Sequence, residues 1–140
     1  GAPVPTPSRR VENMLTMRYL DQDGCPAPRL QDASPDDPAE MREKVAEAIL
    51  ALGKAGVVHT DLSPYNILVK DGRPWFIDLS EAIRLDRVGD TPWIRLTEAE
   101  RALREGIRSL NQYFGRFDLA IDESIVPKMI AQWDRFGVMR

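Results

Sequence analysis

Three polar side chains stand at spacings that suit metal-assisted chemistry: Asp61, Asn66 and Asp78. Asp61 and Asn66 belong to the pattern His-x-Asp-x-x-x-x-Asn, which begins at His59. A small set of carboxylate and amide oxygens suits Mg²⁺ that also carries phosphates. A further acidic group beside such a metal can orient or deprotonate an attacking hydroxyl. These residue types therefore indicate chemistry on a phosphate-bearing substrate.

A β-hairpin is expected to bring these side chains together. The apolar runs 67–69 and 75–77 flank Asp71-Gly72, and Asp-Gly between apolar runs favours a two-residue turn with positive φ at both positions. In that register Asn66 faces Ile77, so Asp78 follows one step further on. The open end of the hairpin should therefore hold Asn66 and Asp78, with Asp61 in the loop that leads into it.

Helices should support this hairpin. The pattern predicts a strand over 13–20, a loop over 21–38 and a helix over 38–54 that begins at Asp36-Asp37-Pro38. The sequence Thr97-Glu98-Ala99-Glu100 is typical of a capping box that opens a second helix, which Gly115 ends. A third helix is expected over about 123–136, with Pro127 in its first turn.

Composition narrows the class of protein. The 140 residues are 43% hydrophobic and 29% charged, which excludes a disordered tail or a small disulfide scaffold. Nineteen basic against 22 acidic residues leave a net charge of -3, so neither membrane binding nor direct sequence-specific nucleic-acid binding is expected. Cys25 is the single cysteine, and no signal peptide is visible. We expect a cytoplasmic protein.

Several motifs resemble the RIO family of atypical serine/threonine kinases. Residues 59–69 are similar to the catalytic loop of that family, and residues 77–82 to its metal-binding segment. Residues 14–20 and 24–30 resemble its hinge and the loop that follows. The resemblance implies an α+β fold: a mainly helical, protein-kinase-like C-terminal lobe with a hinge strand and a catalytic β-hairpin.

The resemblance also implies a role for each matching residue. Asp61 would orient the substrate hydroxyl or accept its proton, while Asn66 and Asp78 would bind Mg²⁺ that bridges the phosphates of ATP. The residue that matches Asp78 is also implicated in the family as a phosphoryl acceptor in an ATPase cycle. Met17 matches the gatekeeper position, and the backbones of Arg18 and Leu20 would meet the adenine edge.

Part of a complete kinase has no counterpart in this sequence. Neither a glycine-rich phosphate loop nor a Val-Ala-x-Lys strand is present. The resemblance therefore implies one partial domain, in which residues 1–20 form the end of the N-lobe and the hinge and residues 21–140 form the C-lobe. The N-lobe is expected upstream, and the fragment is expected to be inactive alone.

Three functions fit these residues. The first is Mg²⁺-assisted transfer of the ATP γ-phosphate to a Ser/Thr hydroxyl, or an ATPase-driven switch, with a protein substrate as partner. The second is a small-molecule kinase of the aminoglycoside or choline type, which shares the His-x-Asp-x-x-x-x-Asn pattern. The third is a non-catalytic, nucleotide-dependent assembly factor on a small-subunit ribosomal precursor, since the RIO family is tied to small-subunit maturation.

Other conspicuous residues are expected to be structural. The one histidine, His59, should brace the catalytic loop through backbone hydrogen bonds, and Trp75 should lie in the core. Arg84, Arg87 and Arg95 follow the metal-binding segment, and we expect them on a solvated surface.

Overall fold

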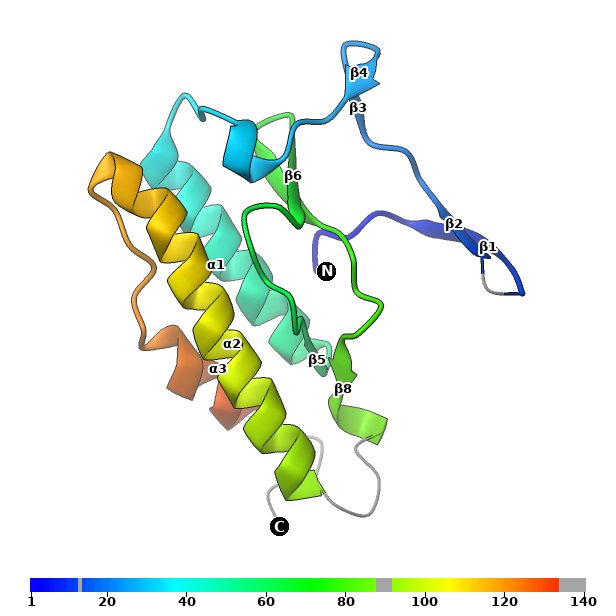
Figure 1. Cartoon of the computed structure of the whole chain (residues 1–140), viewed down its shortest axis with the longest axis vertical. Coiled ribbons are helices and arrows are strands. Elements are labelled where there is room, and N and C mark those ends of the chain that lie inside the picture. Colours follow the sequence, from blue (N-terminus) through cyan, green and yellow to red (C-terminus); the bar gives the residue numbers. More distant parts are fainter. Residues whose placement is uncertain (13, 88–91, 134–140) are drawn as a thin grey trace.

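The computed structural model describes residues 1–12, 14–87 and 92–133. A shorter helix, α3 (Ile125–Trp133), packs against two long helices, α1 (Pro38–Lys54) and α2 (Pro92–Phe114) (Figure 1). The buried side chains of the three helices and of one β-hairpin form a single hydrophobic core. The fold is thus α+β with a mainly helical body. None of the described helices combines the length and apolar character needed to cross a lipid bilayer.

Helix α1 has the predicted bounds. The Asp37 side chain accepts a hydrogen bond of 2.9 Å from the backbone N–H of Glu40, and Pro38 occupies the first turn, where its missing N–H costs nothing. Gly56, at φ 72°, follows the helix end. The predicted apolar stripe is buried: Met41, Val45, Ile49 and Leu52.

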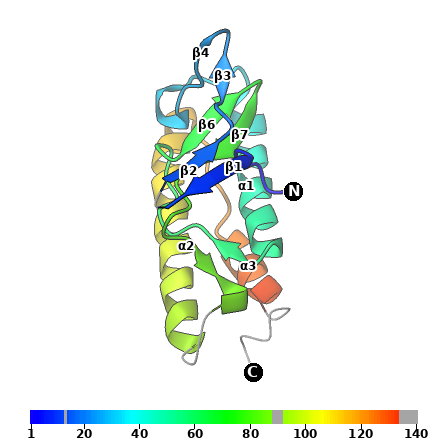
Figure 2. The same ribbon diagram turned by 90° about the vertical axis from the view of Figure 1, so that its right-hand side faces the viewer.

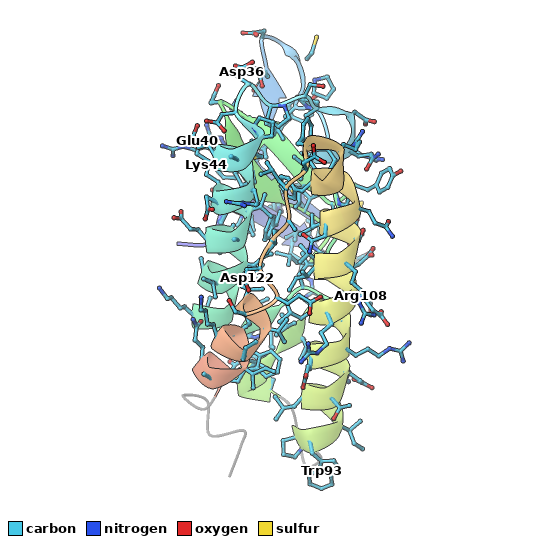
Figure 3. All side chains as sticks on the ribbon, turned by 90° about the vertical axis from the view of Figure 1, so that its left-hand side faces the viewer. Asp36, Glu40, Lys44, Trp93, Arg108 and Asp122 are labelled. Carbon is cyan, nitrogen blue, oxygen red and sulfur yellow. The ribbon has the colours of Figure 1, made fainter. Side chains whose placement is uncertain are left out.

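Helix α2 corrects one prediction. It begins at Pro92, so Thr97 lies inside the helix and does not cap it. The Thr97 hydroxyl donates to the carbonyl of Trp93, four residues earlier, at 2.9 Å, which is a bond within a helix. Trp93 is exposed and lies at the opposite end of the molecule from Asp36 (Figure 3). The predicted end at Gly115 and the predicted stripe are correct: Leu103, Ile107, Leu110 and Phe114 are buried.

Helix α3 begins two residues later than predicted. The Asp122 carboxylate accepts from the N–H of Ser124 at 2.6 Å, and the Asp122 carbonyl accepts from the N–H of Ile125. The hydrogen bonds from Ser124 lower the pKa of Asp122, the one from its backbone N–H being the largest cause. Met129 and Trp133 are buried as expected, while residues 134–136 of the predicted helix lie outside the described residues.

The predicted hairpin is confirmed in register and turn type. Strand β6 (Ile67–Lys70) pairs antiparallel with β7 (Arg73–Phe76), with Lys70 opposite Arg73 and Ile67 opposite Phe76. Asp71 and Gly72 have φ values of 51° and 65°, as a type I′ turn requires. Ile67 and Phe76 are fully buried, and β7 packs on α1, so the helical body fixes the hairpin in place.

Outside the hairpin the structure contains short strands that were not predicted, and β2 is shorter than the strand predicted over 13–20. Strand β1 (Pro7–Val11), where no element was predicted, pairs with β2 (Met14–Met17), and both are exposed along their length. The predicted loop contains a second ladder, β3 (Asp21–Gln22) with β4 (Cys25–Pro26). β5 (Val57–Val58) pairs with β8 (Ile83–Arg84). Figure 1 shows the β1–β2 ladder standing apart from the helices, and in Figure 2 the ladder lies toward the viewer, in front of them.

Three short 3-10 helices complete the described elements. They cover Leu30–Asp32, Leu85–Arg87 and Gly115–Phe117.

Helix α2 supports the loop before the hairpin by a close approach. A Cβ atom added at Gly106 would meet Cβ of Leu62 at 2.6 Å, which is shorter than real side chains allow. Leu62 is buried and follows Asp61 directly. The absence of a side chain at Gly106 therefore lets the catalytic loop rest on the helix.

We expect Gly106→Ala to destabilise the protein by about 1–3 kcal/mol, because the added methyl group overpacks the contact with Leu62. Without that clash the change would raise stability, since alanine favours a helix more than glycine. Chemical denaturation measures the difference. Gly115→Ala is the control, because a Cβ there meets nothing within 4 Å. Equal unfolding free energies for the two variants would contradict the close approach.

Candidate active site

Asp61 and Asn66 meet in the loop that precedes β6. The side-chain amide nitrogen of Asn66 donates to the Asp61 carbonyl at 2.9 Å and to Oδ2 of the Asp61 carboxylate at 3.0 Å. The Asn66 backbone N–H donates to the carbonyl of Ser63 at 3.0 Å, which closes the turn between them. The predicted proximity of these two side chains is confirmed. Nδ2 of Asn66 is thus engaged in hydrogen bonds. Its other side-chain polar atom, Oδ1, has no recorded hydrogen bond within the described residues.

His59 joins the catalytic loop to the end of β7. Its ring is buried, with Nε2 at 2.9 Å from the carbonyl of Ile77, and Nδ1 accepts from the N–H of Asp61 at 3.1 Å. Since Nδ1 accepts a hydrogen bond, a neutral ring carries its proton on Nε2, and that N–H donates to the carbonyl of Ile77. The prediction of a bracing role is confirmed.

Asp78 follows directly at the open end of the hairpin. The N–H of Ile77 donates to the carbonyl of Asn66 at 3.0 Å, which continues the predicted register by one step. Asp78 itself has φ 59°, a left-handed conformation that costs on the order of 1 kcal/mol in a non-glycine residue, although Asp tolerates it better than most. Oδ1 of its exposed carboxylate accepts from the Ser80 hydroxyl at 2.7 Å.

A largely apolar cavity of about 430 Å³ adjoins Asp78. Met17 and Leu15 of β2 line one side, and residues 76–80 line the other. Three residues near the start of the chain also line the cavity: Val4, Pro5 and Pro7. The expected gatekeeper, Met17, and the expected metal ligand, Asp78, thus face one cavity, although they are far apart in the sequence.

Arg18 and Leu20 lie in the link between β2 and β3. The N–H of Arg18 donates to the carbonyl of Thr6 at 2.8 Å, and the carbonyl of Leu20 accepts from the N–H of Ala27 at 3.0 Å. These bonds leave the Arg18 carbonyl and the Leu20 N–H with no recorded partner in the described part of the chain. The Arg18 carbonyl is therefore available as an acceptor and the Leu20 N–H as a donor.

Two of the arginines that follow Asp78 in the sequence are paired with acidic side chains. Arg84 makes two hydrogen bonds to the carboxylate of Asp86, at 3.0 and 2.6 Å, which lower the pKa of that carboxyl. Arg95 pairs with Glu98 at 3.2 Å on α2. Both pairs are exposed, as the sequence predicts for these arginines. Of the lysines, Lys44 donates to the carbonyl of Gly72 and Lys70 binds Asp21, both away from the cavity.

The donor set at the hairpin end fits a magnesium–nucleotide complex better than a protein-only metal site. Among the described residues, no three His, Cys, Asp or Glu side chains are close enough together to hold a metal ion. Magnesium bound through one or two protein oxygens keeps water and substrate phosphates as its other ligands. Asn66 Oδ1 and the exposed carboxylate of Asp78 are the oxygens that suit this role.

Helices packed over a β-hairpin, with a hinge-like link beside an apolar cavity, define the helical part of a protein-kinase-like fold. A family model described as the RIO domain matches residues 1–125. The chain belongs to the RIO-domain family.

Curated relatives carry kinase names. The chain is 35% identical over 99 residues to the serine/threonine-protein kinase RIO1 of Caenorhabditis elegans, covering 69% of this chain and 20% of that protein. It is 32% identical over 116 residues to the RIO-type serine/threonine-protein kinase Rio1 of Haloferax volcanii, covering 83% and 37%. The chain thus spans well under half the length of these relatives.

A solved structure has the same fold. The Rio2 kinase from Chaetomium thermophilum, crystallised as an ADP/Mg²⁺-phosphoaspartate complex, superposes with a TM-score of 0.72 at 22% identity. The match covers 94% of this chain and 39% of the Rio2 chain.

The bracing role of His59 predicts a stability loss on its removal. We expect His59→Phe to lower the free energy of unfolding by about 1–3 kcal/mol, because the Ile77 carbonyl loses its donor inside the fold. Denaturant unfolding followed by circular dichroism measures this. A variant as stable as the wild type would show that the two bonds of His59 contribute nothing to the fold.

Proposed function

We propose that this chain forms the metal-binding and substrate-orienting part of a RIO-type, ATP-dependent phosphotransferase that acts on a Ser/Thr hydroxyl. The observation that carries the proposal is the hairpin register, which brings Asn66 and Asp78 to one end while Asn66 binds Asp61. The RIO kinase names of the relatives and the crystallisation of the Rio2 kinase with ADP and Mg²⁺ support it.

Each residue has a distinct task in this proposal. Asn66 Oδ1 and the Asp78 carboxylate would hold Mg²⁺, which supplies charge neutralisation on the phosphates. Asp61 would orient the hydroxyl of the substrate and accept its proton, with its carboxylate aimed by the Asn66 amide. Most of the rate would come from this positioning and from electrostatics, because phosphoryl transfer asks little covalent work of the protein.

The nucleotide base would bind beside the hinge-like link. Met17 lines the apolar cavity next to Asp78, and the Arg18 carbonyl and the Leu20 N–H offer the acceptor and the donor that an adenine edge needs. Residues 1–20 would then serve as the end of an N-lobe and the hinge, and residues 21–140 as the C-lobe. The chain would be inactive alone, since neither Lys44 nor Lys70 faces this cavity.

An ATPase-driven switch is the second candidate for the same site. The crystallisation of the Rio2 kinase as a phosphoaspartate complex favours this candidate. In the present chain the Asp78 carboxylate is exposed and could accept a phosphoryl group. A small-subunit ribosomal precursor as partner rests on the family resemblance alone. The RIO family match favours both RIO-type candidates over a small-molecule kinase.

The metal ligands can be tested on the chain itself. We expect Asp78→Asn and Asn66→Ala each to lower the Mg²⁺-dependent affinity for ADP at least about tenfold, because each removes one of two protein oxygens from the ion. Isothermal titration calorimetry with ADP, with and without Mg²⁺, gives the metal-dependent part.

Asp71→Asn is the matched control. Asp71 is also in a left-handed conformation, at φ 51°, and sits at the other end of the same hairpin. The control should bind like the wild type. A folded wild-type chain whose ADP binding ignores Mg²⁺ would contradict the proposed metal site.

A further inference from the structure

The segment that carries Asp78 is fixed at both of its ends. At its start, Ile77 is held by two backbone contacts, its N–H to Asn66 and its carbonyl to His59. At its end, Ile83 pairs with Val58 in the β5–β8 ladder. Between these points, residues 78–82 connect the hairpin to β8.

One tertiary hydrogen bond holds this span at its middle. The Thr60 hydroxyl donates to the carbonyl of Glu81 at 2.9 Å. The other recorded bonds of the span are local: Ser80 to the Asp78 carboxylate, and the N–H of Ala82 to the carbonyl of Leu79. Within the residues that the structure describes, Thr60 therefore makes the one recorded hydrogen bond from outside the span to residues 78–82.

The chemistry of Thr60 suits an anchor. A β-branched side chain has few χ1 rotamers, so its hydroxyl points in a defined direction. Thr60 also lies between His59, whose ring is fixed by two hydrogen bonds, and Asp61. The anchor therefore connects the rigid part of the catalytic loop to the span that carries the metal ligand.

The conformation of Asp78 explains why an anchor is needed. A left-handed non-glycine residue persists only where its surroundings hold it. The Ser80 hydroxyl, which orients the Asp78 carboxylate, belongs to the same span and moves with it. A loosened span would thus lose both the backbone conformation of Asp78 and the orientation of its carboxylate.

We propose that Thr60 is a positioning residue for the metal site: its hydroxyl, through the Glu81 carbonyl, holds residues 78–82 so that Asp78 can bind the Mg²⁺ of a magnesium–nucleotide complex. This inference rests on the proposed function, since it assigns Asp78 to the metal. It adds a residue that touches neither metal nor nucleotide.

Two substitutions and a matched control isolate the hydroxyl. Thr60→Val keeps the shape of the side chain and removes the donor, while Thr60→Ser keeps the donor. Thr97→Val removes a bond of the same kind and length, from a threonine hydroxyl to a backbone carbonyl at 2.9 Å, on α2 and away from the site. All three are compared with the wild-type 140-residue chain.

The first readout needs neither metal nor nucleotide. Backbone ¹⁵N order parameters report the rigidity of the amides of residues 79–82. We expect them to fall from about 0.85 to below about 0.6 in Thr60→Val, and to stay at the wild-type value in Thr60→Ser and Thr97→Val. Order parameters in α1 should not change in any variant, which separates local loosening from unfolding.

The second readout is calorimetric titration with ADP, with and without Mg²⁺. Thr60→Val should weaken the Mg²⁺-dependent affinity about three- to tenfold, as loss of one neutral hydrogen bond predicts, and leave the metal-free affinity unchanged. Thr60→Ser should restore it, and Thr97→Val should match the wild type.

Each other outcome overturns the inference in a distinct way. Suppose that the wild type and Thr60→Val bind ADP with the same Mg²⁺-dependent affinity. The hydroxyl of Thr60 then does not position Asp78, while the proposed function stands. If Thr60→Ser fails to restore binding, or Thr97→Val weakens it equally, the hydrogen bond is not the cause. If the wild type shows no Mg²⁺-dependent binding, the proposed metal site fails and Thr60 has no ligand to position.

Discussion

The register of the β6–β7 hairpin is the constraint on which the rest of the site depends. A strand pair that slips by one residue turns every side chain to the other face, so the buried positions of Ile67 and Phe76 permit one alignment. The Asp-Gly turn selects that same alignment from the other end. Because the two agree, the backbone alone brings Asn66 and Asp78 to the same end of the hairpin, with Asp78 one step beyond the residue that faces Asn66.

The site is held by backbone contacts more than by contacts between its own side chains. His59 connects the N–H of Asp61 to the carbonyl of Ile77, so the loop and the strand end move together. The N–H of Phe76 donates to the carbonyl of Pro3 at 2.8 Å, which ties the first residues of the chain to β7. The proposed phosphotransferase function suits this construction, because such catalysis depends on where charged oxygens are held.

Local signals in the sequence accounted for much of the fold. Asp37 and Pro38 set the start of α1, Asp71-Gly72 set the hairpin, and the spacing of apolar residues identified the buried faces of the helices. Predictions were wrong where a local signal competed with a tertiary one. Thr97 has the pattern of a helix cap, but the helix continues upstream to Pro92, and the Thr97 hydroxyl binds within it. Strands of two residues, such as β5 and β8, are too short to show a pattern.

By itself, the sequence determined the chemistry of Asp61, Asn66 and Asp78 and their order around one hairpin, because a two-residue turn fixes which residues face each other. The tertiary structure alone decided what surrounds them. The cavity between Met17 and Asp78, the approach of Leu62 to Gly106 and the bond from Thr60 to Glu81 all join residues distant in the chain. Contacts of that kind arise from tertiary packing, for which the spacing of residues along one chain carries no signal.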